Sequence, residues 1–175
     1  MKRSGKPGFV RFRCSGLNGF SELSVRAEEF QAPPPGVTRA YVVENEITYL
    51  AFPCPRGSMV IWGHGYAVPV LEPLVWLRDL ELIYWGDIDT HGLAILNRLR
   101  HRFPSARSML MDRSTLLTHR DQWVVEDKPT DARLDKLDAE ESALYADLVS
   151  GLLGPSVRLE QERIRFAAIT EHLRA

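Results

Sequence analysis

The stretch "YWGDIDTHGLAIL", residues 84–96, places two aspartates between an apolar run and the start of a helical pattern. Asp87 and Asp89 are one residue apart, and like charges this close repel each other and resist removal from water. Because residues i and i+2 of a strand point to the same face, both carboxylates are expected on one side of a strand end. Carboxylate oxygens suit a hard cation such as Mg²⁺, which usually takes one or two of them. The stretch therefore predicts a metal site at the end of a buried strand.

Strand and helix patterns alternate on both sides of this stretch. The expected strands cover residues 39–44, 58–62, 80–86 and 106–111, and the expected helices cover residues 45–52, 68–80, 93–103 and 114–123. This alternation predicts an α/β fold with a mostly parallel sheet of about four strands and helices on both faces. Ligands of such sheets bind at the carboxyl ends of the strands. Several acids lie at or just past these ends, namely Glu44, Asp87, Asp89 and Asp112.

The two ends of the chain differ in sequence pattern from this alternating central part. Residues 1–38 contain one strand candidate, residues 9–14, and a proline-rich loop. They are expected to form an amino-terminal arm or edge strand with a linker, so that the main domain covers residues 39–175. Residues 126–147 are rich in charge and helix formers, and the apolar spacing of residues 156–175 predicts a carboxyl-terminal helix.

Composition excludes several classes of protein. No apolar run approaches the roughly 20 residues of a membrane span, and the basic start is not followed by the apolar stretch of a signal peptide. Cys14 and Cys54 lack the spacing of a zinc site or a disulfide framework, which indicates a reducing cytoplasm. The formal net charge of −1 predicts that any contact with DNA uses local patches.

One such patch is expected within residues 2–13. This segment has several basic residues and no acid, and they are Lys2, Arg3, Lys6, Arg11 and Arg13. The segment either follows a phosphate backbone or is a chain end and edge strand with solvated arginines. The sequence does not separate these two interpretations.

The order of strands, helices and acids resembles the Toprim domain, a Rossmann-like fold of topoisomerases, primases and some nucleases. "DIDTHG" (87–92) is similar to the D-x-D-P-x-G signature of the A subunit of type IIB topoisomerases, with Thr90 where proline is usual. The closer resemblance, from about Arg39 to the end of the chain, is to the carboxyl-terminal Toprim domain of the JetD family, the nuclease subunits of Wadjet anti-plasmid systems. The blocks that carry it are "VVENEITYLAFP" (42–53), "WGHGYAV" (62–68), "YWGDIDTHGLAILNRLR" (84–100), "SMLMDRSTLL" (108–117) and "RLEQERI" (158–164).

The resemblance implies a Mg²⁺-dependent endonuclease, with Mn²⁺ as a substitute, that cuts plasmid DNA alongside a condensin-like SMC complex. It places Glu44, Asp87 and Asp89 on the Toprim acidic triad as catalytic and metal-binding residues. JetD-like proteins have a larger amino-terminal DNA-binding half, so this chain is expected to be a fragment or a short relative. Cutting both strands requires two active sites, which favours a homodimer. No winged-helix domain with an attacking tyrosine is visible, so water is the expected nucleophile.

Six further residues are candidates for contacts to substrate or for support of the metal ligands. They are Glu46, His64, His91, Asp112, Glu160 and Glu162. Glu46 is an alternative ligand beside Glu44, and Asp112 is more often a helix cap. The glycines beside His64 and His91 let backbone approach a phosphate, and simple turns explain them equally. In a helix over residues 156–175, Glu160 and Glu162 would point to opposite sides, so at most one of them faces the site.

Two other functions compete with DNA cleavage. A Toprim-like scaffold would bind DNA or dimerise without cutting, and the complete set of three acids argues against it. Phosphatases of the haloacid dehalogenase type also use a strand-end D-x-D. Their motif usually ends the first strand and has threonine or valine two residues on, whereas here two expected strands precede it and His91 takes that position.

Overall fold

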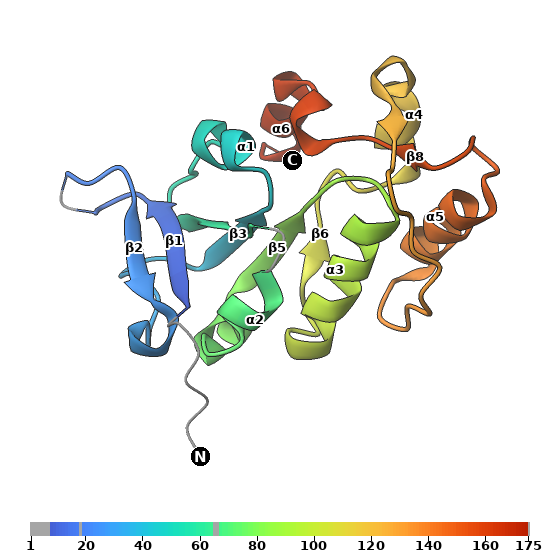
Figure 1. The fold of residues 1–175 in the computed structure, drawn as a ribbon. Coiled ribbons are helices and arrows are strands. Elements are labelled where there is room, and N and C mark those ends of the chain that lie inside the picture. The colour runs from blue at the N-terminus through green and yellow to red at the C-terminus, as the bar shows by residue number, and fades with distance from the viewer. Residues whose placement is uncertain (1–7, 18, 65–66, 175) are drawn as a thin grey trace.

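The computed structural model describes residues 8–17, 19–64 and 67–174, and its centre is a six-stranded sheet (Figure 1). The strands of this sheet are β1 (Phe9–Cys14), β2 (Leu23–Arg26), β3 (Arg39–Val43), β4 (Ser58–Trp62), β5 (Glu81–Trp85) and β6 (Arg107–Ser108). Their order is β2-β1-β4-β3-β5-β6. The four strands from β4 to β6 run parallel, and β1 is antiparallel to both of its neighbours. The predicted α/β fold is confirmed, with six strands in place of about four.

Helices and a small second sheet surround this centre. The α-helices are α1 (Glu46–Ala51), α2 (Ala67–Leu71), α3 (Thr90–Arg102), α4 (Arg113–Thr118), α5 (Ala139–Ser150) and α6 (Phe166–His172). The 3₁₀ helices are η1 (Ala27–Glu29), η2 (Val75–Asp79), η3 (Arg120–Gln122) and η4 (Gln161–Arg163). The second sheet pairs β7 (Val124–Val125) with β8 (Val157–Arg158). None of the helices in the described ranges has the length and apolar character of a membrane span.

The chain connections diverge at the carboxyl ends of β3 and β5. From β3 the chain passes through α1 to β4 on one side, and from β5 it passes through α3 to β6 on the other. Because connections between parallel strands are right-handed, α1 covers one face of the sheet, and α2 and α3 cover the opposite face. Neighbouring strands whose connections leave in opposite directions form the crevice in which α/β sheets bind ligands. Glu44 and Asp87 follow these two strands.

The core explains why the central strands have nearly continuous apolar sequences. Val42 and Val43 of β3 are fully buried, as are Tyr84 of β5 and most of its neighbours, because both faces of the sheet are covered. The apolar residues of α3 occur at helical spacing, and Leu96 and Leu99 are completely buried. The rim acids are therefore attached to well-packed elements.

Some predicted elements are shorter than expected. The helix predicted over residues 68–80 is divided into α2 and η2, because Pro73 disfavours helical backbone at the residue before it. The strand predicted over residues 106–111 contributes only β6, and Leu110 has a φ of 53° that no regular strand adopts. The helix predicted over residues 114–123 is α4 followed by η3.

The helix predicted over residues 156–175 is wrong for its first half. Residues there form β8 and η4, and the helix begins only at Phe166 in α6. Leu159 exchanges two backbone hydrogen bonds with Ile88, at 2.9 and 3.0 Å between nitrogen and oxygen. Since Ile88 lies between the two aspartates, this pairing brings the carboxyl-terminal segment against them.

The amino-terminal strand is part of the same sheet. The prediction that residues 9–14 form a strand is confirmed by β1, but β1 lies between β2 and β4, and the edge position belongs to β2. The functional division of the chain after residue 38 stays a prediction.

The described basic residues of this strand make internal contacts. Arg11 forms ion pairs with Glu22 at 2.8 Å and with Glu46 at 2.5 Å, and Arg13 donates to a backbone carbonyl of α1 at 2.7 Å. These contacts favour the structural interpretation for Arg11 and Arg13. Three other basic residues of the segment, and the glycine that follows His64, lie outside the described residues, namely Lys2, Arg3, Lys6 and Gly65.

The start of α3 fixes the position of the aspartate pair. Asp89 caps the helix, and its Oδ1 accepts a hydrogen bond from the Gly92 backbone N–H at 2.6 Å. The helix therefore begins at Thr90, three residues before the predicted start. A Cβ atom at position 92 would overlap the carbonyl oxygen of Asp87, so only glycine fits there without a shift of the backbone.

We predict that Gly92→Ala lowers the unfolding free energy by about 1–3 kcal/mol, because the added methyl group forces the helix start away from the aspartate loop. Urea unfolding followed by circular dichroism measures the change. The control is Gly8→Ala, since a Cβ there would meet only Val70 at 3.9 Å. Equal stability of the two variants would contradict the close packing at position 92.

Candidate functional site

Three carboxyl groups lie just past the carboxyl ends of β3 and β5. Glu44 follows β3, and Asp87 and Asp89 follow β5. The Oε1 atom of Glu44 is buried and has no hydrogen-bond partner within the part of the chain that the structure describes. Burial raises the pKa of Glu44 to about 7, and the negative charges of Asp87 and Asp89 also raise it. The three groups are therefore close enough to repel one another.

Asp89 is the most buried of the three acids, with 3% of its surface exposed. Burial raises the pKa of Asp89 to about 6, against the effect of the Gly92 N–H that its side chain accepts. Glu126 and Asp87 raise this pKa as well. Asp89 thus combines the structural role of a helix cap with membership of the acidic group.

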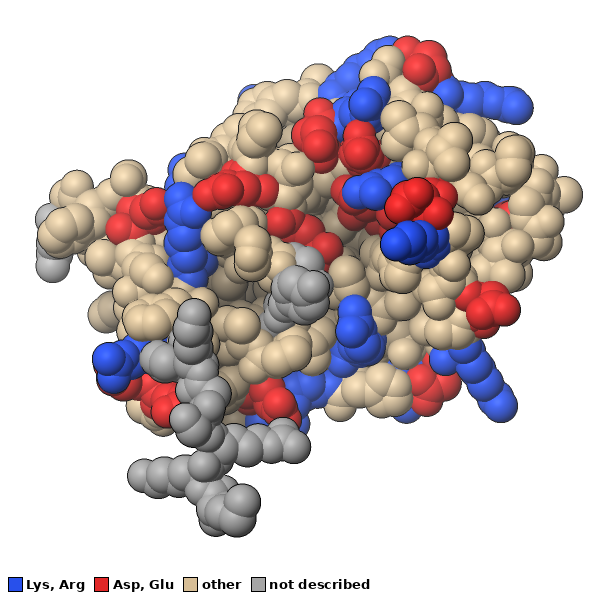
Figure 2. All heavy atoms as spheres, viewed as in Figure 1, with Lys and Arg blue, Asp and Glu red and all other residues tan. Residues whose placement is uncertain are grey.

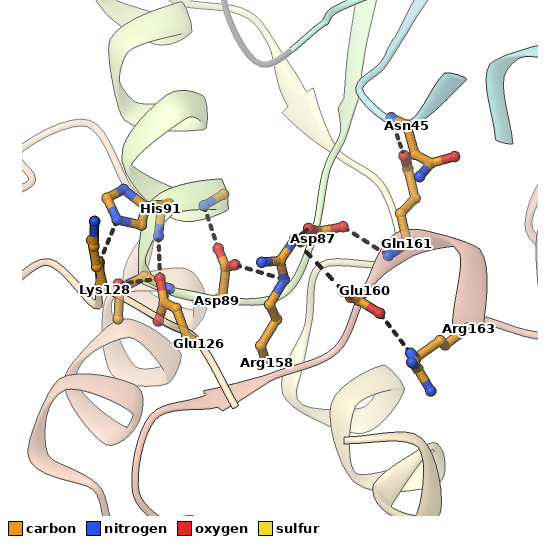
Figure 3. A network of polar contacts seen from close by, with 12 residues as sticks. Asn45, Asp87, Asp89, His91, Glu126, Lys128, Arg158, Glu160, Gln161 and Arg163 are labelled. Carbon is orange, nitrogen blue, oxygen red and sulfur yellow. Dashed lines mark hydrogen bonds and ion pairs between the residues drawn. The ribbon is translucent and has the colours of Figure 1, made fainter. Parts of the chain in front are cut away.

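Arg158 of β8 lies between the two aspartates (Figure 3). Its Nη2 is 2.5 Å from Oδ2 of Asp87, and its Nε is 3.3 Å from Oδ2 of Asp89. The same Nη2 is 4.0 Å from a carboxylate oxygen of Glu160. The guanidinium therefore offsets part of the negative charge that the two aspartates bring together.

Gln161 forms hydrogen bonds to the chain at the ends of both β3 and β5. Its side chain is completely buried, donates to the carbonyl of Trp85 at 2.8 Å and accepts from the backbone N–H of Asn45 at 2.9 Å. Its own backbone N–H donates to Oδ1 of Asp87 at 2.8 Å. One residue of the carboxyl-terminal segment therefore links the chain after β3 to the end of β5 and bonds to Asp87.

Comparison with known protein families identifies the family of this chain. The family described as Wadjet protein JetD, C-terminal, matches residues 4–173. The chain belongs to this JetD family. The predicted family is thereby confirmed, and it associates the chain with Wadjet systems and their partner subunits. The relationship to Toprim domains stays a prediction. A search among curated proteins finds no match.

In this JetD-family chain, Glu126 is a buried acid that sequence reasoning missed. It is 3% exposed and accepts hydrogen bonds from the Thr90 hydroxyl at 2.7 Å, and from the backbone N–H groups of Thr90 and His91 at 3.2 Å each. A carboxylate at a helix start is favoured by the positive end of the helix dipole. Thr90, in the place where the related signature has proline, supplies two of these donors. Glu126 follows the apolar residues Val124 and Val125, so the strand-end pattern that marked Glu44 could have marked it.

Arg158 and Gln161 were missed for a different reason. Both lie in the block "RLEQERI" that carries part of the family resemblance, but the expected helix concealed their position. Their contacts depend on the pairing of Leu159 with Ile88, which no local pattern predicts. A basic residue in a family block was the signal available for Arg158, because buried acids require a counter-charge.

Glu46 and Asp112, two of the six further candidates, make structural contacts away from the three acids. Glu46 is the first residue of α1 and pairs with Arg11. Asp112 caps α4, and its side chain accepts from the backbone N–H and the hydroxyl of Thr115 at 2.8 and 2.9 Å. The structural interpretation is favoured for both.

The two histidine side chains contact different parts of the protein. The ring of His91 contacts the backbone carbonyl of Lys128 at 2.6 Å, so it faces away from the aspartates. His64 is exposed, and its ring centroid is 4.3 Å from that of Trp62. Trp62 in turn donates its indole N–H to the backbone carbonyl of Glu44 at 3.0 Å. Of the two histidines, His64 is the one linked to Glu44, through the ring of Trp62.

Glu160 and Glu162 are not on opposite sides of a helix, because helical structure begins after Glu160 with the short η4. Glu160 accepts from Arg163 at 2.7 Å and also approaches Arg158, whereas Glu162 accepts from the side chain of Asn45 at 2.9 Å. Glu160 is therefore the one of the pair that lies next to the aspartates.

The donor chemistry of this site fits a hard divalent cation. All three acids offer carboxylate oxygen, and Glu44 has a buried oxygen atom without a hydrogen-bond partner among the described residues. Among the described residues, no group of three His, Cys, Asp or Glu side chains stands ready arranged to hold a metal ion. Arg158 instead holds one oxygen of each aspartate, so a cation bound by the three acids requires these ion pairs to be exchanged.

We predict that Glu126→Ala lowers the unfolding free energy by about 1–3 kcal/mol, because it leaves buried donors at the start of α3 without an acceptor. Urea unfolding measures the loss. Asp127→Ala is the matched control, because Asp127 is exposed and adjacent in sequence. A loss no greater than that of the control would contradict the role assigned to Glu126.

We predict that Glu44→Gln makes the metal-free protein more stable at pH 8 by about 1–3 kcal/mol. The folded state binds a proton at Glu44 more tightly than the unfolded chain, because the pKa of Glu44 is raised from 4.5 to about 7. Wild-type stability therefore falls as the pH rises from about 4.5 towards 7, whereas glutamine has no charge to bury. Urea unfolding in EDTA at several pH values measures the difference, which should vanish near pH 4.

The exposed Glu72 provides the control for this pH series, and Glu72→Gln is expected to follow the wild-type curve. Parallel curves for wild type and Glu44→Gln from pH 4 to pH 8 would show that Glu44 is not buried among other acids.

Proposed function

We propose that Glu44, Asp87 and Asp89 form the active site of a Mg²⁺-dependent endonuclease that hydrolyses DNA phosphodiester bonds. The observation that carries the proposal is the position of these carboxyl groups, just past the carboxyl ends of the neighbouring parallel strands β3 and β5. Burial and mutual repulsion raise the pKa of two of them, to about 7 for Glu44 and about 6 for Asp89. Such an arrangement is costly for stability and is typical of functional sites. Membership of the JetD family supports it.

In this proposal the three acids hold the cation, and Mn²⁺ can replace Mg²⁺. A divalent cation at such a site polarises a phosphoryl oxygen and stabilises the attacking or leaving oxygen. Glu44 either completes the set of metal ligands or accepts the proton from the attacking water. Asp89 and Asp87 are held in place by the backbone N–H groups of Gly92 and Gln161, so they need little reorganisation to act.

Water is the proposed nucleophile. Tyr41, Tyr49 and Tyr84 have 2%, 0% and 0% of their surface exposed, so none of these three can attack a phosphodiester without local unfolding. Burial also raises the pKa of Tyr84 well above its ordinary value, which makes its hydroxyl a poorer nucleophile. Attack by water gives hydrolysis rather than a covalent intermediate on these tyrosines.

The proposed substrate is double-stranded plasmid DNA, with condensin-like SMC subunits of a Wadjet system as partners and a homodimer as the form that cuts both strands. On the face drawn in Figure 2, acidic and basic side chains are interspersed rather than gathered into one continuous basic surface. Together with the net charge of −1, this mixed distribution of charge favours DNA binding through local contacts and partner subunits.

One observation favours a second candidate, a Toprim-like scaffold that binds DNA or dimerises without cutting. Arg158 already neutralises part of the charge of Asp87 and Asp89, so the acids have a counter-ion without a metal. Metal-dependent turnover separates the two candidates.

We predict that the protein nicks supercoiled plasmid in Mg²⁺ or Mn²⁺, and that Asp87→Asn lowers the nicking rate at least about 100-fold. Agarose gel electrophoresis of the plasmid measures the rate. Asp79→Asn is the control, because Asp79 is exposed and lies at the other end of β5, and it should nick like wild type.

Three results would contradict the proposal. Nicking that survives Asp87→Asn would place the activity elsewhere. Hydrolysis of a small phosphomonoester without nicking would indicate a phosphatase. DNA binding without any turnover, combined with no Mn²⁺ binding, would indicate the scaffold.

A further inference from the structure

We infer that Arg158 is a resident counter-ion that competes with the divalent cation for Asp87 and Asp89, and that, once displaced, it binds a phosphate oxygen of the substrate. This inference rests on the proposed function and concerns the same site. It assigns to one residue both the stability of the metal-free site and a contact to the DNA backbone.

The carboxylate oxygens of the two aspartates are divided between backbone donors and Arg158. Oδ1 of Asp87 accepts the backbone N–H of Gln161, and Oδ1 of Asp89 accepts the backbone N–H of Gly92. Both Oδ2 atoms contact the guanidinium of Arg158, at 2.5 and 3.3 Å. The backbone donors belong to packed elements, so the Oδ2 atoms are the ones that a cation can take. A cation there displaces the guanidinium, because two positive groups this close repel each other.

The backbone of Arg158 cannot leave the site when its side chain is released. Arg158 pairs with Val124 in the two-stranded sheet, and the next residue, Leu159, is bonded in both directions to Ile88. Ile88 lies between the two aspartates. A displaced Arg158 side chain therefore stays within its own length of the acids.

The guanidinium has donors to spare for a phosphate. Its Nε is buried and forms no well-aligned hydrogen bond within the described ranges, although it lies 3.3 Å from Asp89. The side chain is 33% exposed, so it is open to a ligand from solvent. Arginine is well suited to phosphate because its planar fork donates two parallel hydrogen bonds. The only other acid within 4.0 Å of it among the described residues is Glu160, which is already paired with Arg163.

The first test measures binding of Mn²⁺ alone by calorimetric titration of wild type, Arg158→Met and Arg163→Met. Methionine keeps the length of the side chain and removes its charge and donors. Arg158→Met is expected to bind Mn²⁺ about tenfold more tightly than wild type, because no counter-ion has to be displaced. Arg163→Met removes an equal charge from a residue whose ion pair in the described part of the chain is with Glu160, and should leave the affinity unchanged.

The second test measures plasmid nicking by the same variants at saturating Mn²⁺. Arg158→Met is expected to nick at least about 100-fold more slowly in spite of its tighter metal binding, and Arg158→Lys should recover part of the rate. A merely structural ion pair predicts weaker Mn²⁺ binding for Arg158→Met, because the acids would lose their arrangement. If Arg158→Met does not fold, Arg158→Gln decides, since glutamine keeps polar donors but has no charge that competes with the cation, and it should still tighten Mn²⁺ binding.

The outcomes separate this inference from the proposed function. If wild type nicks DNA and Asp87→Asn does not, but Arg158→Met binds Mn²⁺ no more tightly than wild type, the inference is wrong and the nuclease stands. If neither wild type nor Arg158→Met binds Mn²⁺, both are wrong. If Arg158→Met binds Mn²⁺ more tightly but nicks at the wild-type rate, Arg158 competes with the cation but does not bind the substrate phosphate.

Discussion

Repulsion among Glu44, Asp87 and Asp89 is the constraint on which the arrangement of this protein depends. Parallel strands bring the three groups together in a partly buried space, where like charges are costly. The offset comes from the carboxyl-terminal segment, which returns across the ends of β3 and β5 and supplies Arg158 and Gln161. The same segment that stabilises the metal-free acids therefore occupies the positions from which a metal and a phosphate would be bound.

The fold explains why these acids are held firmly. They lie at the point of the sheet where the chain connections diverge, and the aspartates lead directly into the 13-residue helix α3. Gly92 allows that helix to start against the Asp87 carbonyl, and Glu126 satisfies the donors on its first turn. A catalytic group attached to packed elements and fixed by backbone donors keeps its geometry better than one on a free loop. The structural contacts around the site thus serve its proposed chemistry.

Local patterns predicted the elements that carry the acids, and long-range pairing determined the rest. The strand ends at Glu44 and Asp87 and the cap at Asp112 follow from apolar runs and capping rules within a few residues. Pro73, which divides the helix expected over residues 68–80, was visible in the sequence and should have shortened it. The contacts of Arg158 depend on a strand pairing across some 70 residues of chain, as its bond to Asp87 shows. Helical spacing of apolar residues in that segment favoured the wrong element, because tertiary pairing overrode local preference.

The central claim is that a divalent cation binds where β3 and β5 end. Anomalous diffraction from a crystal soaked in Mn²⁺ tests it most directly. We expect a peak about 2 Å from carboxylate oxygens of Glu44, Asp87 and Asp89, with the guanidinium of Arg158 turned away from both aspartates. The absence of a peak at these strand ends, with Arg158 still between the aspartates in millimolar Mn²⁺, would contradict the account.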